Sequence, residues 1–164
     1  MPNWVIDWDN PDDVEVHIFV PRLSITYTKT VGENEITGTV TVPSRFISTP
    51  GGTIPYYPSL TTQKQCTFEF AALDSAMAQI SAGDSVKSLY AVHSATLEVI
   101  EYDTPLSKYF SSINGSLDQY SIRTDESVYS NVSGGIGIVG TYTTNWVTYF
   151  FDQRYVQRFG YRYR

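Results

Sequence analysis

Short runs rich in Val, Ile, Thr, Tyr and Phe recur along the chain, with Gly, Pro, Asn and Asp between them. Runs of this kind are typical of all-β folds, because branched and aromatic side chains pack well on a pleated surface. The pattern predicts a single domain over residues 1–164. We expect a β-sandwich of about eight to ten mostly antiparallel strands with two short helices.

Alternation of apolar and polar residues marks the individual strands. In Val14–Val20 the branched residues fall on one face, and Pro21 is expected to end the strand. A turn at Gly32 lies between two alternating runs, which predicts a hairpin. The expected strands are Trp4–Trp8, Val14–Val20, Ser24–Thr30, Ile36–Val42, Val86–Val92, Ala95–Tyr102, Gly137–Thr143, Trp146–Phe151 and Tyr155–Tyr163.

Two stretches have helical rather than strand periodicity. From Phe70 to Ile80 apolar residues recur at helical spacing, and Gly83 follows as the stop. The same spacing recurs from Leu106 to Ile113. There Thr104 is the expected N-cap and Pro105 the first helical residue.

Composition narrows the class of protein further. The chain has 164 residues, a formal net charge of −6 and one cysteine. One cysteine cannot form an internal disulfide, which excludes a disulfide-rich scaffold. Cys66 alternates with Phe68 and Phe70, so we expect a free thiol buried in the core. The acidic balance argues against general nucleic-acid binding, because neutralisation of phosphates dominates that affinity.

The start of the sequence bears on location. The residues Met1 to Trp4 lack the basic and apolar regions of a signal peptide. No apolar run approaches the roughly 20 residues that a membrane helix requires. If the protein is exported, we expect its export signal to lie outside this sequence.

Two segments are candidate binding surfaces. The loop Ser44–Thr62 carries Tyr56 and Tyr57 between prolines, and could present an aromatic platform to a sugar or a peptide. The C-terminal end is rich in Arg and Tyr, which are enriched where interfaces are tightest. Its arginines are Arg154, Arg158, Arg162 and Arg164. The alternative is that they neutralise the acidic N-terminal stretch within the fold.

No set of residues predicts an enzyme, a metal site or a cofactor. Residues 135–140 match G-x-G-x-x-G, but poor helix formers follow and too little chain remains for a dinucleotide fold. The acidic stretch Asp7–Asp13 lacks the glycine and the closing glutamate of an EF-hand. Glu98 and Glu101 are predicted on opposite strand faces, so they do not form a pair of glycosidase carboxylates.

The segment from Tyr129 to Gly140 reads Tyr-Ser-Asn-Val-Ser-Gly-Gly-Ile-Gly-Ile-Val-Gly. It resembles the C-terminal signature Tyr-Ser/Thr-Asn-Ile/Val-x-x-Gly-Ile/Leu-Gly-Ile/Val-Phe of exported Bacteroidota lipoproteins of unknown function. The matching positions are Tyr129, Asn131, Gly135 and Gly137, and Val139 stands in place of Phe. Members of that family are typically encoded beside TonB-dependent outer-membrane receptors.

The resemblance implies a place in the cell envelope. The relatives are longer, with a lipoprotein signal and an N-terminal β-domain, so the chain would be the C-terminal portion of an exported protein. Membrane association would then run only through a lipid anchor absent from this chain. The family has no established catalytic residues, so the resemblance assigns none here.

Three functions stay open at this stage. The first is a non-enzymatic accessory module at the outer membrane, on its periplasmic face or at the cell surface. It would act by contact with a protein partner such as a TonB-dependent transporter. The second is a carbohydrate- or peptide-binding module at Tyr56 and Tyr57. The third is a surface-fibre or adhesin subunit, whose free edge strand Tyr155–Tyr163 would accept a neighbour's strand.

Overall fold

The computed structural model describes residues 3–8, 17–43, 64–116, 129–134 and 137–164. These residues form seven strands in two sheets, together with three α-helices and one short 3-10 helix, which confirms a β-rich, mostly antiparallel fold. The expectation for the whole chain was eight to ten strands, and the described residues hold seven. The elements are β1 (Asn3–Asp7), β2 (Ile18–Val31), β3 (Asn34–Val42), β4 (Gln65–Glu69), α1 (Phe70–Gln79), η1 (Lys87–Leu89), β5 (Tyr90–Tyr102), α2 (Thr104–Ser116), β6 (Tyr142–Phe150), α3 (Gln153–Arg158) and β7 (Arg162–Tyr163).

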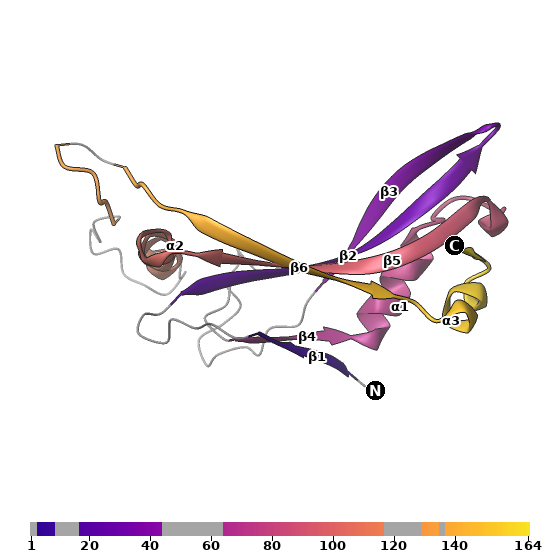
Figure 1. Ribbon diagram of the computed structural model, residues 1–164, viewed down its shortest axis with the longest axis horizontal. Helices are drawn as coiled ribbons and strands as arrows, with labels where there is room; N and C mark the ends of the chain where they lie inside the picture. The colour runs from indigo at the N-terminus through magenta and orange to yellow at the C-terminus, as the bar shows by residue number, and fades with distance from the viewer. Residues whose placement is uncertain (1–2, 9–16, 44–63, 117–128, 135–136) are drawn as a thin grey trace.

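The larger sheet is long and twisted, and its strands run in the order β3-β2-β5-β6 (Figure 1). Neighbours on this path are antiparallel, and β7 adds in parallel to β5 where β6 has ended. β1 and β4 form a separate antiparallel pair below the larger sheet. The path therefore leaves β3 and β6 as the two outer strands.

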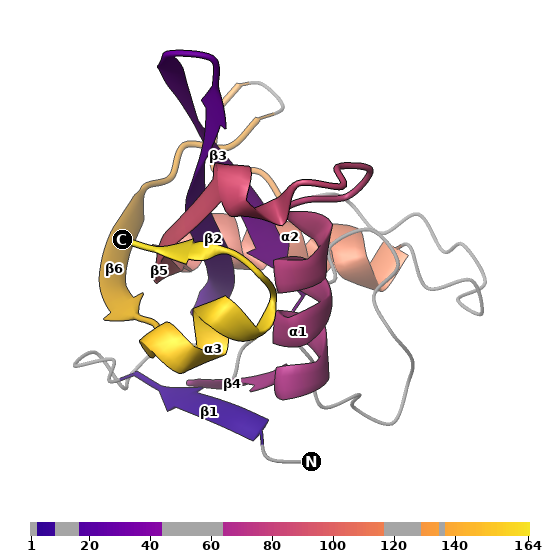
Figure 2. The same ribbon diagram turned by 90° about the vertical axis from the view of Figure 1, so that its right-hand side faces the viewer.

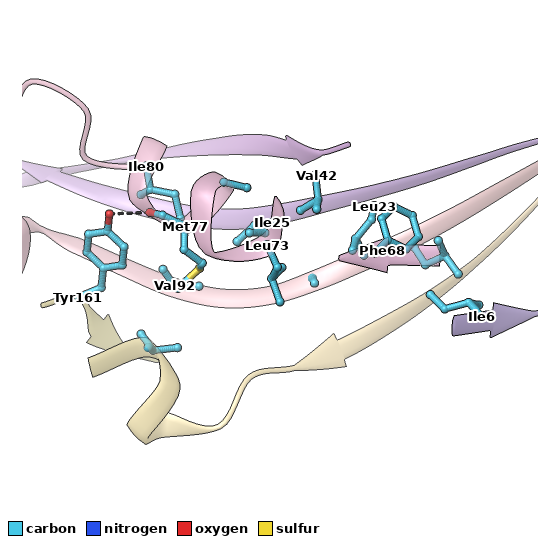
Figure 3. Close-up of a cluster of buried hydrophobic side chains, with 14 of the residues drawn as sticks. Ile6, Leu23, Ile25, Val42, Phe68, Leu73, Met77, Ile80, Val92 and Tyr161 are labelled. Atoms are coloured by element: carbon cyan, nitrogen blue, oxygen red, sulfur yellow. Dashed lines mark hydrogen bonds between the residues drawn. The ribbon is translucent and has the colours of Figure 1, made fainter. Parts of the chain in front are cut away.

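Strand alternation separates two faces of the larger sheet. The inner face carries Leu23 and Ile25 of β2, which are completely buried. They join Phe68 of β4 and Met77 of α1 in one apolar core (Figure 3). The hydroxyl of Tyr161 donates to the carbonyl of Met77 at 2.7 Å and ties the C-terminal end to this core. Figure 2 shows α1 and the β1–β4 pair gathered on this side of the sheet.

A smaller core lies at the other end of the sheet. Ile18, Val20 and Ile100 are buried there, and Phe110 of α2 packs against them. Alternation places these residues on the face opposite to Leu23 and Ile25. The two faces are thus covered at different ends of the sheet.

The hairpin and both long helices are confirmed. β2 and β3 pair with Val31 opposite Asn34, around a turn at Gly32, whose φ of +62° suits glycine. α1 begins at Phe70 as expected. α2 differs only at its start, because the carboxylate of Asp103, rather than Thr104, caps it by accepting from Leu106 N at 3.0 Å.

Two strand boundaries were predicted wrongly. Pro21 lies inside β2, opposite Val99 of β5, and does not end the strand. β3 pairs with β2 only as far as Leu23, so no described strand pairs with β2 on that side at Pro21, where a missing N–H is tolerated. The strand expected at Val86–Val92 begins only at Tyr90, because Lys87–Leu89 form η1. Its remainder joins Ala95–Tyr102 in the single strand β5, where a shift in register leaves His93 unmatched as a bulge.

The C-terminal segment also differs from expectation. Tyr155–Tyr163 is not a strand, because Asp152 accepts from the backbone N–H groups of Arg154 and Tyr155 and starts α3. Gly160, with a φ of +84°, follows the helix. Only Arg162–Tyr163 are extended.

Gly137–Thr143 is not a strand as predicted, since β6 begins at Tyr142. The outer strand on this side of the sheet is therefore β6, which includes most of the predicted strand Trp146–Phe151.

Candidate functional site

The predicted aromatic platform, Tyr56 and Tyr57, lies outside the described residues. Of the predicted arginines, Arg158 forms an ion pair with Asp74 of α1 at 2.7 Å and stacks beside the rings of Tyr155 and Phe159. Burial, followed by the hydrogen bond to Asp74, raises the pKa of Tyr155. Arg158 therefore helps to dock α3 on α1.

The remaining C-terminal arginines do not gather into one patch. Arg162 donates to the hydroxyl of Thr30 at 2.7 Å, and Arg164 pairs with Glu35 of β3 at 2.5 Å. Arg154 contributes its backbone N–H to the cap of α3. The ion pairs of the C-terminal arginines are thus formed with carboxylates of α1 and β3. Within the described part of the N-terminal acidic stretch, Asp7 accepts a hydrogen bond from Gln65.

The family-like segment is held by its own side chains. The amide of Asn131 accepts from Val139 N at 2.8 Å and donates to Val139 O at 2.6 Å, as a neighbouring strand would. The hydroxyl of Ser130 accepts from Gly137 N at 3.2 Å. Tyr129 N donates to Ser112 of α2, and Gly135 lies outside the described residues. The side chains of Ser130 and Asn131 thus bind backbone groups of the same segment and hold its conformation.

Asp103 connects this segment to α2. Its carboxylate accepts from Thr141 N at 2.6 Å and from the Thr141 hydroxyl at 2.9 Å, besides capping the helix. Partial desolvation raises the pKa of Asp103, but these hydrogen bonds outweigh it and hold the pKa below its usual value. Asp103 thereby fixes the point at which the chain enters β6.

One arrangement resembles a catalytic relay. His17 Nδ1 lies 2.6 Å from Glu101 Oε1, and Thr104 Oγ1 lies 3.5 Å from His17 Nε2. Acyl transfer would also require backbone N–H donors for an oxyanion. Residue 105 is proline, and the next two N–H groups of α2 are already bonded to Asp103. The first N–H groups of α2 are thus not free to act as oxyanion donors, and the contact links the residue before β2 to β5 and α2.

Neither thiol nor metal chemistry is apparent among the described residues. Cys66 is free and buried, as predicted. Burial, followed by the charge of Asp7, raises the pKa of its thiol to about 12, so the thiol is protonated at neutral pH. No group of three or more His, Cys, Asp or Glu side chains comes together in the described ranges to hold a metal.

A pocket of about 160 Å³ lies between β1 and the β5–β6 pair. Most of its lining residues are apolar, and the polar ones among them are Asp7, Glu101 and Asn145. Two of these side chains already have partners, since Glu101 pairs with His17 and Asp7 with Gln65. The Nε1 of Trp8 is buried with no hydrogen-bond partner in the structure as described. The pocket is small and its carboxylates are engaged, which makes it a weaker candidate than the strand beside it.

The most distinctive surface is β6 itself. This nine-residue strand carries no charged side chain, and it pairs with β5 on one side only among the described strands. Trp146, Val147 and Phe150 are 69%, 52% and 78% exposed. Figure 2 shows β6 at the margin of the molecule, away from α1. Large apolar side chains are seldom exposed together on an edge strand, so β6 is the candidate functional site.

The sequence analysis identified a strand here but not its position in the sheet. Rings recur at every fourth residue of β6, at Tyr142, Trp146 and Phe150. On a strand this spacing places all of them on one face. That signal was present in the sequence, but only the strand order shows that this strand is an outer one.

No family model matches the chain, and neither a curated protein nor a solved structure is significantly similar to it. Among the described helices, none has the length and apolar character needed to cross a membrane.

Proposed function

We propose that the protein is a non-enzymatic interaction module, and that a strand of a protein partner adds to the edge of β6 with which no described strand pairs. The observation that carries this proposal is the exposed, uncharged and largely apolar outer strand. An outer strand presents unpaired N–H and C=O groups that can continue the ladder into a second chain.

The finer form of the proposal comes from the sequence resemblance. The chain would belong to a sandwich-like module of an exported lipoprotein at the outer membrane, with a TonB-dependent transporter or another envelope complex as partner. The support from the fold is that the signature segment around Asn131 directly precedes β6 in the chain. Asn131 binds the backbone of Val139, and Asp103 binds that of Thr141, just before the strand begins. The same edge would also serve the fibre-subunit alternative if its partner were a second copy.

The proposal can be tested with two matched substitutions. Val147 on β6 and Ile36 on β3 are both exposed apolar residues on the outer strands of one sheet, at 52% and 56%. A lysine on an edge strand opposes strand addition. We expect V147K to abolish recovery of a cross-linked partner from the native envelope, whereas I36K should leave it intact.

Mass spectrometry of cross-linked complexes and sedimentation of the purified protein provide the readouts. Recovery of an envelope protein through β6 supports the accessory role, and concentration-dependent self-association lost in V147K supports the fibre role. The proposal is wrong if the wild type neither self-associates nor cross-links to a partner. It is equally wrong if V147K and I36K behave alike.

A further inference from the structure

Three exposed rings form a row on one face of β6. Tyr142, Trp146 and Phe150 are 66%, 69% and 78% exposed, and their side chains lie on the same face of the strand. Successive rings are four residues apart, or about 13 Å along a strand. The row is therefore a narrow aromatic track along the rim of the sheet.

Hydroxyl groups continue this surface across the sheet. Register places Thr148 beside Thr96 of β5, then Ser24 of β2 and Thr41 of β3. The next row, starting from Phe150, continues in the same way. We call this surface the outer face. Its polar part, with the strand β6 beside it, consists of Arg22, Ser24, Thr26, Thr37, Thr39, Thr41, Ser94, Thr96, Glu98, Tyr142, Thr144, Trp146, Thr148 and Phe150. Beside Tyr142 and Thr144 the same face is apolar, because Tyr102, Ile100, Val20 and Ile18 lie there with Phe110 of α2.

The charge of the outer face is balanced. Its charged side chains are paired: Glu98, which lies beside Trp146, approaches Arg22 to 3.7 Å, and Glu35, further along the same face of β3, pairs with Arg164. Nucleic acid or anionic lipid would require a cluster of Lys and Arg. A docked apolar protein surface would require a contiguous apolar patch, whereas here the rows that start at Thr148 and Phe150 carry hydroxyl groups across β5, β2 and β3. Charge complementarity thus favours an uncharged ligand that is rich in hydroxyl groups.

We propose that the outer face binds a neutral polysaccharide chain laid along β6. A pyranose ring exposes C–H groups on its face and hydroxyl groups around its rim. The face would stack on Trp146 and Phe150, and the rim would exchange hydrogen bonds with Thr148, Thr96 and Ser94. A partner strand added to β6 would widen the sheet and leave this face open, so the two proposals are compatible and independent.

The test is affinity electrophoresis of the folded chain through gels that contain a soluble neutral β-glucan, a xylan or a galactomannan. We expect at least one of them to retard the wild type. The double variant W146A/F150A should bind it about tenfold more weakly, as expected for the loss of two ring contacts. V147A is the matched control, because Val147 lies on the same strand with its side chain on the opposite face, and it should bind like the wild type.

Circular dichroism confirms that the variants are folded. Absence of retardation of the wild type in all three gels overturns the inference, as does equal retardation of W146A/F150A and wild type. A loss in V147A as large as that in the double variant also overturns it. Failure here is distinct from failure of strand addition, which is measured by V147K in cross-linking and requires no polysaccharide.

Discussion

β3 and β6 are the two outer strands of the same sheet, and they differ in the charge and the apolar exposure of their side chains. β3 carries Glu35, which is paired with Arg164, and its other residues on the outer face are threonines. Its one large exposed apolar side chain is Ile36, on the opposite face. Its inner side is packed against α1, and the ring of Tyr27 covers Gly38 so closely that a Cβ there would lie 2.6 Å from the ring. β6 has no charged residue and exposes its largest apolar side chains.

The difference shows what each edge is suited for. Charged side chains and β-bulges are ways in which proteins prevent edge strands from pairing with other chains. β3 has a charge at Glu35, whereas β6 has neither a charge nor a bulge in its pairing with β5. The contrast within one sheet is the reason to assign binding to β6 and a structural role to β3.

The largest expected effect comes from removing the support of β3. Met77 of α1 is completely buried in the main core, so M77A should lower the free energy of unfolding by about 2–5 kcal/mol. Chemical denaturation measures the change, and hydrogen exchange should show the greater loss of protection in β3. The exposed Gln79 on the same helix provides the control Q79A, which should change stability by about 0.5 kcal/mol or less. A similar loss of protection in β6 would contradict the comparison.

A smaller effect is expected where the chain enters β6. D103A removes the cap of α2 and both hydrogen bonds to Thr141, and should cost about 1–2 kcal/mol. D103N keeps an acceptor oxygen at this position, so its free energy of unfolding should lie between those of the wild type and D103A. Urea unfolding monitored by tryptophan fluorescence measures the difference. A cost equal to zero would show that Asp103 does not anchor β6.

The same residue predicts a pH dependence. The pKa of Asp103 is held below its usual value in the folded state. The contribution of its ionised carboxylate to the free energy of unfolding is therefore fully present above the unfolded pKa of about 3.9. It is lost as the pH falls through the folded pKa. The stability difference between wild type and D103A should therefore be constant near neutral pH and shrink below about pH 4. A difference that grew on acidification would contradict this assignment.

The smallest stability effect is expected on β6 itself. Trp146 is largely exposed, so W146A should change the free energy of unfolding by about 0.5 kcal/mol or less. Thermal unfolding followed by far-UV circular dichroism checks this. If W146A instead lost several kcal/mol, the ring would be a packing residue and β6 would resemble β3.

Local chemistry made a good part of the fold predictable. The β2–β3 hairpin follows from two alternating runs around Gly32, and α1 follows from helical spacing after Phe70. The buried thiol of Cys66 follows from its alternation with Phe68. In each case the signal and the structure lie within a few residues of one another.

The predictions that were wrong failed because of contacts between residues that are distant in the sequence. Pro21 is tolerated inside β2 because β3 stops short of it, and His93 is absorbed as a bulge because Thr26 and Tyr27 shift register opposite it. Residues 137–141 read as a strand, but side chains of Asn131 and Asp103 take up backbone groups there. None of these partners is adjacent in sequence to the residue it affects.

The sequence by itself determined the periodicities: which residues alternate, where helical spacing begins, and that three rings share one face of a strand. The tertiary structure decided which strand stands at the edge, because strand order depends on pairing between segments far apart in the chain. Side-chain alternation is a property of a single strand, whereas an unpaired edge is a property of the whole sheet. That is why the aromatic row of β6 could be read from the sequence, but its exposure could not.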